Sequence, residues 1–138
     1  MADELNIEII SPDSQVLKDQ VESITVPGTS GSFQVLKNHA PLISTFEIGV
    51  IKVKKSGNDP MHFTTSGGTV EVNKNKVLVL SDSIEKVDKI DINRAEEAKK
   101  RAEERLANKN VETVDVARAE AALNRAVNRI KAYGKFNQ

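Results

Sequence analysis

Six arginines in the last third of the chain have a spacing that suits the binding of an anion. They form two trios with the same internal steps of seven and four positions. The trios are Arg94, Arg101 and Arg105, and Arg118, Arg125 and Arg129. Steps of seven and eleven residues return to within about 20° of the same direction on an α-helix, so each trio forms one stripe. Guanidinium groups bind phosphate and carboxylate oxygens through paired hydrogen bonds, which makes an anion site one reading of the stripes.

The same residues also fit a reading without a ligand. Two solvated helices commonly carry Glu–Arg pairs three or four positions apart, and Glu97 with Arg101 has this spacing. The sequence pattern alone leaves both readings open.

Other kinds of reactive site find little support in the sequence. The chain has no Cys, which removes disulfides, thiolate metal ligands and cysteine nucleophiles. It has no glycine-rich phosphate loop, and Gly67-Gly68 is more typical of a turn or a bulge. His39 and His62 lack the spacing of metal ligands, and no nucleophile elbow surrounds Ser66. We therefore expect a protein without catalytic activity.

The elements that must position the arginines are two predicted helices. From Ile90 onward, apolar residues recur every three or four positions. The stripes are Ala95, Ala98, Ala102 and Leu106, followed by Val116, Ala119, Leu123, Ala126, Ile130 and Tyr133. We expect Asp91 to cap the first helix and Thr113 or Asp115 to cap the second. A short connection favours an antiparallel hairpin, whose narrow alanine-rich seam buries little area and leaves the hairpin able to open.

Residues 1–86 show a different pattern, in which apolar residues alternate with polar ones in short runs. The runs are Leu5, Ile7 and Ile9; Ile24 and Val26; Phe46, Ile48 and Val50; Val70 and Val72; and Val77 and Val79. All four prolines and six of the seven glycines lie before residue 69, where they separate these runs. We expect an α+β chain in two parts, with an N-terminal antiparallel β-sandwich over residues 1–86 and a C-terminal antiparallel two-helix hairpin over residues 87–138.

The charge balance limits the classes of partner. Twenty basic and twenty acidic residues give a formal net charge of zero, so no global field attracts nucleic acid or an anionic bilayer. The longest stretch without charged residues covers only 14 residues, from Ser23 to Leu36, which is too short to span a membrane. The acidic start is unlike a secretion signal. We expect no nucleic-acid partner and no direct insertion into a membrane.

Several segments together carry a family resemblance. The first is Gly31-Ser-Phe-Gln-Val-Leu-Lys-Asn-His39-Ala-Pro41-Leu42, and the second is Ser66-Gly67-Gly68 followed by Val70-Glu71-Val72. With the acidic start and the Arg/Ala pattern of the hairpin, their order and spacing resemble the epsilon subunits of bacterial ATP synthases across nearly the whole chain. The resemblance implies a sandwich that binds the rotating gamma subunit and the c-ring. It places those contacts on Ser32, Lys37 and His39, in a loop that we expect to be exposed.

The start of the first predicted helix adds a second resemblance. Ile90-Asp91-Ile92-Asn93-Arg94-Ala95 is similar to the [IL]-D-x-x-R-A signature of epsilon subunits that bind ATP in the folded hairpin. The resemblance implies nucleotide contacts at Glu85, Ile90, Asp91, Arg94, Ala95, Arg101, Arg125 and Arg129. ATP would then be a regulatory ligand, and no cofactor is required.

The resemblance further implies a hairpin that extends into the alpha/beta catalytic head and inhibits ATP hydrolysis. From Arg118 onward the chain carries five basic residues and a single acidic one, Glu120. We expect Arg118, Arg125, Arg129 and Lys131 to make this inhibitory contact with acidic surfaces. The implied protein is a non-catalytic rotor subunit, peripheral to the cytoplasmic face of the bacterial cell membrane.

Two other functions remain open from the residues themselves. The chain could act as a free-standing ATP sensor whose hairpin changes shape, or as a carbohydrate- or peptide-binding β-domain with an inert helical tail. Co-purification with gamma and the catalytic head would separate the rotor subunit from both.

Overall fold

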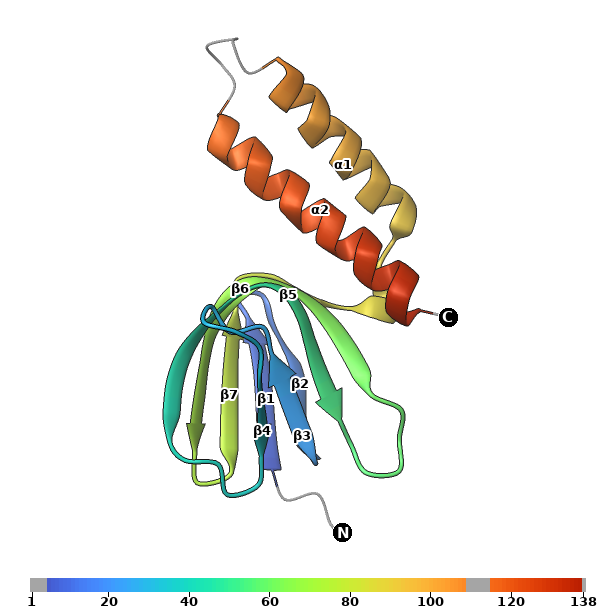
Figure 1. The fold of residues 1–138 in the computed structure, drawn as a ribbon. Coiled ribbons are helices and arrows are strands. Elements are labelled where there is room, and N and C mark those ends of the chain that lie inside the picture. Colours follow the sequence, from blue (N-terminus) through green and yellow to red (C-terminus); the bar gives the residue numbers. More distant parts are fainter. Residues whose placement is uncertain (1–4, 109–114, 138) are drawn as a thin grey trace. The chain divides into compact units, whose positions relative to one another are not determined.

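The computed structural model describes residues 5–108 and 115–137 (Figure 1). The chain divides into two compact units, Met1–Lys86 and Val87–Gln138. The first unit is a β-sandwich and the second holds two helices, so the predicted fold class is confirmed. No helix in the described ranges is long and apolar enough to cross a membrane.

The described part of the first unit contains eight strands in one continuous sheet. They are β1 (Leu5–Ser11), β2 (Ser14–Val21), β3 (Ser23–Val26), β4 (Phe33–Leu36), β5 (Leu42–Lys54), β6 (Met61–Asn73), β7 (Lys76–Ser81) and β8 (Ile84–Lys86). Seven strands follow the order β2-β1-β7-β6-β5-β3-β4, and β8 pairs with β6. The strands curve around a common core, as Figure 1 shows.

One strand pair departs from the antiparallel arrangement that we expected. β1 and β7 are parallel, with Ile7 opposite Val77 and Ile9 opposite Val79. Alternation of apolar and polar residues is the same in parallel and antiparallel strands, so the sequence pattern did not reveal this direction. The pairing places β1 inside the sheet, between β2 and β7.

Apolar residues, most of them aliphatic, fill the core of the sandwich. The buried cluster is Leu5, Ile7, Ile9, Val21, Ile24, Val26, Val35, Phe46, Ile51, Val53, Phe63, Val70, Val72, Val77 and Val79. Most of these residues belong to the alternating runs of the sequence, because one face of each strand turns inward.

The predicted core residues Ile48 and Val50 are exceptions. Both are only half-buried, and Ile51 and Val53 of the same strand are buried instead. The buried face of β5 therefore changes between Phe46 and Ile51. The prediction for Ile48 and Val50 was wrong because it extended the alternation from Phe46. A simple strand pattern assumes that the same face is buried along the whole strand.

Glycines of the paired strand lie at this change of face. Gly67 has φ +117, a conformation that side-chain-bearing residues rarely adopt. At Gly68 an added Cβ would overlap the carbonyl oxygen of Leu80. Nearby, the buried hydroxyls of Thr65 and Ser81 lie 2.7 Å apart, and Ser81 Oγ donates to the carbonyl of Ser83 at 2.8 Å. The bend thus keeps its polar groups bonded without water.

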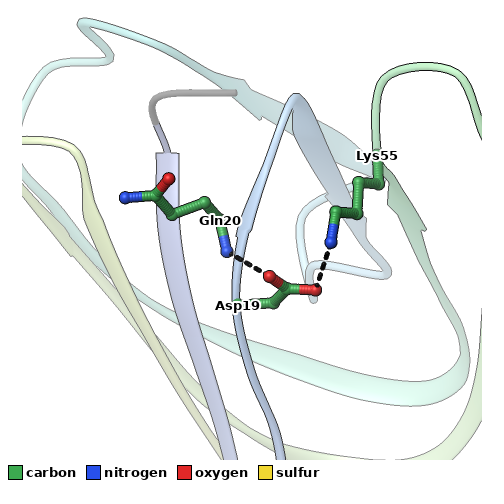
Figure 2. A network of polar contacts seen from close by, with 3 residues as sticks. All are labelled: Asp19, Gln20 and Lys55. Atoms are coloured by element: carbon green, nitrogen blue, oxygen red, sulfur yellow. Dashed lines mark hydrogen bonds and ion pairs between the residues drawn. The ribbon is translucent and has the colours of Figure 1, made fainter. Parts of the chain in front are cut away.

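An ion pair joins β2 to the residue that follows β5, and these two strands are not neighbours in the sheet (Figure 2). Lys55, just after β5, donates from Nζ to Oδ2 of Asp19 in β2 at 3.0 Å. The backbone N–H of Gln20 donates to the other carboxylate oxygen at 2.8 Å. The bond from Lys55, followed by the bond from Gln20, lowers the pKa of Asp19 below its usual value. The carboxylate of Asp19 is therefore stabilised in its charged form.

The second unit contains the 3-10 helix η1 (Val87–Lys89), followed by α1 (Ile92–Ala107) and α2 (Val116–Phe136). The two α-helices pack antiparallel through a seam of small residues (Figure 1). The buried seam residues are Ala95 and Ala102 in α1 and Ala119, Ala126 and Ala132 in α2. The predicted stripes are confirmed, with Ala98, Leu106, Val116, Leu123, Ile130 and Tyr133 half-buried beside them.

Candidate anion-binding face of the hairpin

Each helix carries its arginines directly beside its seam. Four exposed arginines each precede a buried alanine of the seam. The four pairs are Arg94 and Ala95, Arg101 and Ala102, Arg118 and Ala119, and Arg125 and Ala126. Because each residue turns by about 100° around the helix axis, these arginines lie about 100° to one side of their seam.

The antiparallel arrangement brings both sets to the same face. Seen from one end, the second helix turns in the opposite sense, and its seam also points in the opposite direction. These two reversals cancel, so the residue before a seam residue lies on the same side in both helices. We call this side the arginine face. It comprises Arg94, Arg101, Arg105, Arg118, Arg125 and Arg129.

The arginines also match in their height along the hairpin. α1 ends at Ala107 and α2 begins at Val116, and these two ends lie level with each other in Figure 1. Arg105 and Arg118 each lie two residues from these ends, whereas Arg94 and Arg129 each lie thirteen residues from them. At a rise of about 1.5 Å per residue, the two level pairs are about 16 Å apart along the hairpin. Arg101 and Arg125 lie between them.

Two aspartates hold the starts of the helices. Asp91 is the N-cap of α1 and accepts a hydrogen bond from the backbone N–H of Arg94 at 3.2 Å. Asp115 is the N-cap of α2 and accepts from the backbone N–H of Arg118 at 3.0 Å. The predicted cap at Asp91 is confirmed, and of the two candidates for α2 the structure uses Asp115. Thr113 lies outside the described residues.

Among the described glutamates of the two helices, Glu97 lies closest to the arginine face, four positions before Arg101. Three glutamates of the hairpin each follow a seam alanine and therefore lie on the opposite face: Glu96, Glu103 and Glu120. Among the described residues, no side chain bonds to the guanidinium groups of Arg94, Arg101 or Arg125. The Glu97–Arg101 ion pair of the alternative reading is not formed. The face thus presents cationic donors that an anion can bind.

The other residues predicted to contact a nucleotide occupy different settings. Ala95 is fully buried in the seam, and Ile90 is 6% exposed just before α1. The backbone N–H of Ile90 donates to the carbonyl of Val87 at 3.2 Å. Glu85 belongs to the first unit, where it lies opposite Thr64 in the pairing of β8 with β6. The hairpin therefore unites Asp91 with the four predicted arginines, while Glu85 lies in the other unit.

The four residues predicted for the inhibitory contact do not share one face. Arg118, Arg125 and Arg129 belong to the arginine face. Lys131 is exposed five residues after Ala126 and lies on the other flank of α2. A flat partner that binds the arginine face of the folded hairpin would not reach Lys131.

The predicted contact loop in the first unit needs a correction. Ser32 and Lys37 are exposed, but β4 (Phe33–Leu36) lies between them and pairs with β3. The strand forms because Val35 alternates into the core and is fully buried. Ser32 and the Lys37–His39 segment therefore lie at opposite ends of a strand and not in one loop.

Sequence reasoning missed two asparagines that fix this second segment. Asn38 and Asn75 have φ values of 64° and 62°, in the left-handed region. The backbone N–H of Asn38 donates to Oδ1 of Asn75 at 2.6 Å, and Nδ2 of Asn75 donates to Oδ1 of Asn38 at 3.4 Å. Asparagine is enriched at positive φ, but no sequence pattern indicates that these two residues, 37 positions apart, would meet.

The described residues contain no group of His, Asp and Glu that could hold a metal ion. The arginine face is the candidate ligand site of the hairpin, because its exposed guanidinium groups suit the binding of an anion.

Comparison with known protein families assigns both units. Residues 4–87 match the β-sandwich domain of the ATP synthase delta/epsilon chain, and residues 88–134 match its long α-helix domain. An ATP synthase epsilon chain of Desulfitobacterium hafniense (strain Y51) is 48% identical over 106 residues, which cover 77% of this chain and 80% of the relative. An ATP synthase epsilon chain of Desulforamulus reducens is 39% identical, over 96% of this chain and 98% of the relative.

Solved structures show the same fold at lower identity. A chain of the Euglena gracilis mitochondrial ATP synthase, in a structure of OSCP, F1 and c-ring, matches with a TM-score of 0.80 and 21% identity, over 96% of this chain and 82% of that one. A chain from the central stalk and c-ring of the Tetrahymena thermophila mitochondrial ATP synthase matches with a TM-score of 0.62 and 13% identity, over 99% and 98%. With both family domains matched in order, the chain belongs to the family of ATP synthase delta/epsilon chains, which are non-catalytic subunits of that enzyme.

Proposed function

We propose that this chain is a rotor subunit of an ATP synthase, in which the sandwich binds the gamma subunit and the c-ring. The match of both units to the family carries this proposal, supported by relatives named as epsilon chains over most of their length. In this role the subunit is peripheral to the membrane, on its cytoplasmic face. The exposed Ser32 and Lys37 at the two ends of β4, with His39, are the candidate contacts.

The hairpin is proposed to bind ATP in its folded form, without hydrolysis. The supporting observation is a face of arginines from both helices, where Arg94, Arg101 and Arg125 are exposed and form no ion pair with the described residues. Phosphate oxygens would accept hydrogen bonds from these guanidinium groups and from Arg129. The backbone near Ile90 and the side chain of Asp91 would face the adenine edge.

Opening of the hairpin would separate the arginines of α1 from those of α2. A ligand shifts an equilibrium only through different affinities for the two states, and this separation supplies the difference. ATP is therefore proposed to hold the hairpin closed. The open hairpin would extend toward the alpha/beta catalytic head, where Arg118, Arg125, Arg129 and Lys131 would contact acidic surfaces and inhibit hydrolysis.

A pull-down with tagged full-length chain tests the rotor role. Recovery of gamma and the alpha and beta subunits is the expected result. Their absence would favour a second candidate, a free-standing ATP sensor, for which the exposed arginine face would be the functional part.

Calorimetric titration of the full-length chain tests the nucleotide site. Arg94→Ala and Arg125→Ala should each weaken ATP binding by about 1.5–3 kcal/mol, the range for hydrogen bonds to charged groups. Lys100→Ala removes an exposed charge outside the arginine face and should leave the affinity unchanged. No heat with millimolar ATP, or equal losses in all three variants, would contradict ATP binding on this face.

The proposed inhibitory contact is tested in the assembled enzyme. Replacing Arg118, Arg125, Arg129 and Lys131 together by Ala should release ATP hydrolysis while the complex stays intact. Unchanged inhibition would contradict an inhibitory contact that depends on charge.

A further inference from the structure

The two helices of the hairpin repeat one short segment in sequence and in conformation. Asp91-Ile-Asn-Arg94-Ala95 at the start of α1 corresponds to Asp115-Val-Ala-Arg118-Ala119 at the start of α2. The two aspartates have nearly equal backbone angles, with φ −84 and ψ 100 at Asp91 and φ −89 and ψ 102 at Asp115. Both accept a hydrogen bond from the backbone of the arginine three residues later. The repeat is therefore structural as well as sequential.

Two equivalent helices that run antiparallel are related by an approximate twofold rotation. This rotation exchanges α1 and α2 and leaves the arginine face on the same side. It moves Arg94 onto Arg118, Arg101 onto Arg125 and Arg105 onto Arg129, because the trios share one sequence offset. The rotation therefore moves the four arginines that are proposed to bind ATP onto a second set of four arginines. The first set lies at the end of the hairpin that holds Arg94, and the second lies at the end where the two helices are connected. The second set is Arg101, Arg105, Arg118 and Arg125.

The second set has the features that make the first a candidate site. Arg105 and Arg118 lie level with each other, two residues from the adjoining helix ends. All four arginines of the set are exposed. None of their guanidinium groups bonds to a side chain within residues 5–108 and 115–137. Helices that pack through alanine approach closely, so guanidinium groups from both sides can reach one phosphate chain.

We propose that Arg101, Arg105, Arg118 and Arg125 form a second polyphosphate site on the arginine face. Its ligand is a chain of two or three phosphates; the base contacts proposed near Ile90 belong to the first site, so ATP prefers that site. The proposal rests on the proposed ATP site for its reference geometry. Because Arg101 and Arg125 belong to both sets, a triphosphate bound at one end excludes a second at the other.

Titration of the full-length chain with inorganic tripolyphosphate, which has no base, tests the second site. The wild type should bind one equivalent, distributed between two mutually exclusive positions. Removal of one position, by Arg94→Ala with Arg129→Ala or by Arg105→Ala with Arg118→Ala, should weaken the apparent affinity only about twofold. Removal of all four outer arginines should weaken it by tenfold or more, as expected when hydrogen bonds to charged groups are lost.

A matched control removes the same charge elsewhere. Lys100→Ala with Lys131→Ala changes one exposed residue of each helix outside the arginine face and should bind as the wild type does. Far-UV circular dichroism confirms that each variant keeps its helices. The proposal is overturned if the wild type binds no tripolyphosphate, or if Arg94→Ala with Arg129→Ala loses binding as fully as the fourfold variant. It is also overturned if the lysine control loses as much as either arginine pair.

Parallel titrations with ATP separate this result from the proposed function. If ATP binds equally well to the wild type and to Arg94→Ala with Arg129→Ala, ATP does not prefer the first site and the proposed function fails. Tripolyphosphate binding that survives in that variant and weakens by tenfold or more in the fourfold variant supports the second site in either case.

Discussion

The side chain of Asn75 accepts a hydrogen bond from the backbone N–H of Asn38 at 2.6 Å, across 37 positions of sequence. The backbone carbonyl of Asn75 also accepts a hydrogen bond, from the backbone N–H of Asn6 at 2.8 Å. One residue in the turn between β6 and β7 thus binds the start of β1 and the segment after β4. That segment carries Lys37 and His39, the candidate partner contacts, so Asn75 sets the backbone from which they project.

Substitution of Asn75 should show both of its roles. Asn75→Gly keeps the left-handed conformation but loses the side-chain bonds, and should destabilise the sandwich by about 1 kcal/mol. Asn75→Ala adds a left-handed alanine, which costs roughly a further 1 kcal/mol. Amide hydrogen exchange in the β-strands of the full chain measures the difference. An alanine variant as stable as the glycine variant would contradict this account.

Because the two N-caps are equivalent, removing either one should cost the hairpin the same stability. Asp91→Ala and Asp115→Ala should each reduce the stability of the hairpin by about 1 kcal/mol, because each leaves a backbone N–H of its helix without a partner. Asp91→Asn and Asp115→Asn keep a capping oxygen and should stay near wild type. Thermal loss of the helical circular dichroism signal measures all four variants. A large loss at one cap only would contradict the equivalence of the two helix starts.

The ion pair of Asp19 predicts an acid-dependent contribution to stability. The pKa of Asp19 is lowered in the folded state by Lys55 and by the backbone of Gln20. A carboxyl pKa that is lowered by folding contributes stability at pH values above its ordinary value of 3.8, and this contribution disappears as the pH falls through the pKa of the folded state. Asp19→Asn should therefore be less stable than the wild type at neutral pH, and the two should converge in acid.

Urea unfolding at several pH values measures this convergence. Asp59→Asn, at an exposed position outside the ion pair, serves as the control. A difference between Asp19→Asn and the wild type that stays constant down to the lowest pH would show that the charge of Asp19 is not its source.

Replacement of glycine by alanine should change the stability in opposite directions at two positions. Gly68→Ala places a Cβ against the carbonyl of Leu80 and should destabilise the sandwich by about 3 kcal/mol or more. Gly134→Ala lies in α2 with nothing within 4 Å of the added Cβ and should stabilise that helix by about 0.5–1 kcal/mol. Chemical unfolding followed separately for strand and helix signals tests the pair. A stable Gly68→Ala variant would show that the strands can separate at this bend.

Local features of the fold could be predicted from the sequence. The caps at Asp91 and Asp115 depend on residues only three positions away, and the alanine seam depends on helical periodicity. The meeting of the two arginine stripes also follows, because a repeat in an antiparallel hairpin places equivalent residues on one face. These relationships need little information from distant parts of the chain.

Relationships between distant residues could not be predicted in the same way. The parallel pairing of Ile7 with Val77 and the bond of Asn38 to Asn75 join segments that only the complete sandwich brings together. The change of buried face after Phe46 depends on how β5 passes around the core. Lys131 was grouped with three arginines because all four are basic residues of the second helix. Counting charges did not show that Lys131 lies on a different face of that helix.

The place of β1 within the sheet has a consequence for the order in which the protein forms during synthesis. β1 pairs on one side with β2, which follows at once, and on the other with β7, which ends at Ser81. On a ribosome the sandwich must wait for β7 to emerge before β1 gains its second neighbour. Until then one edge of β1 is open to pairing with other chains. The part of translation before β7 emerges is therefore the period in which a chaperone would protect this protein most.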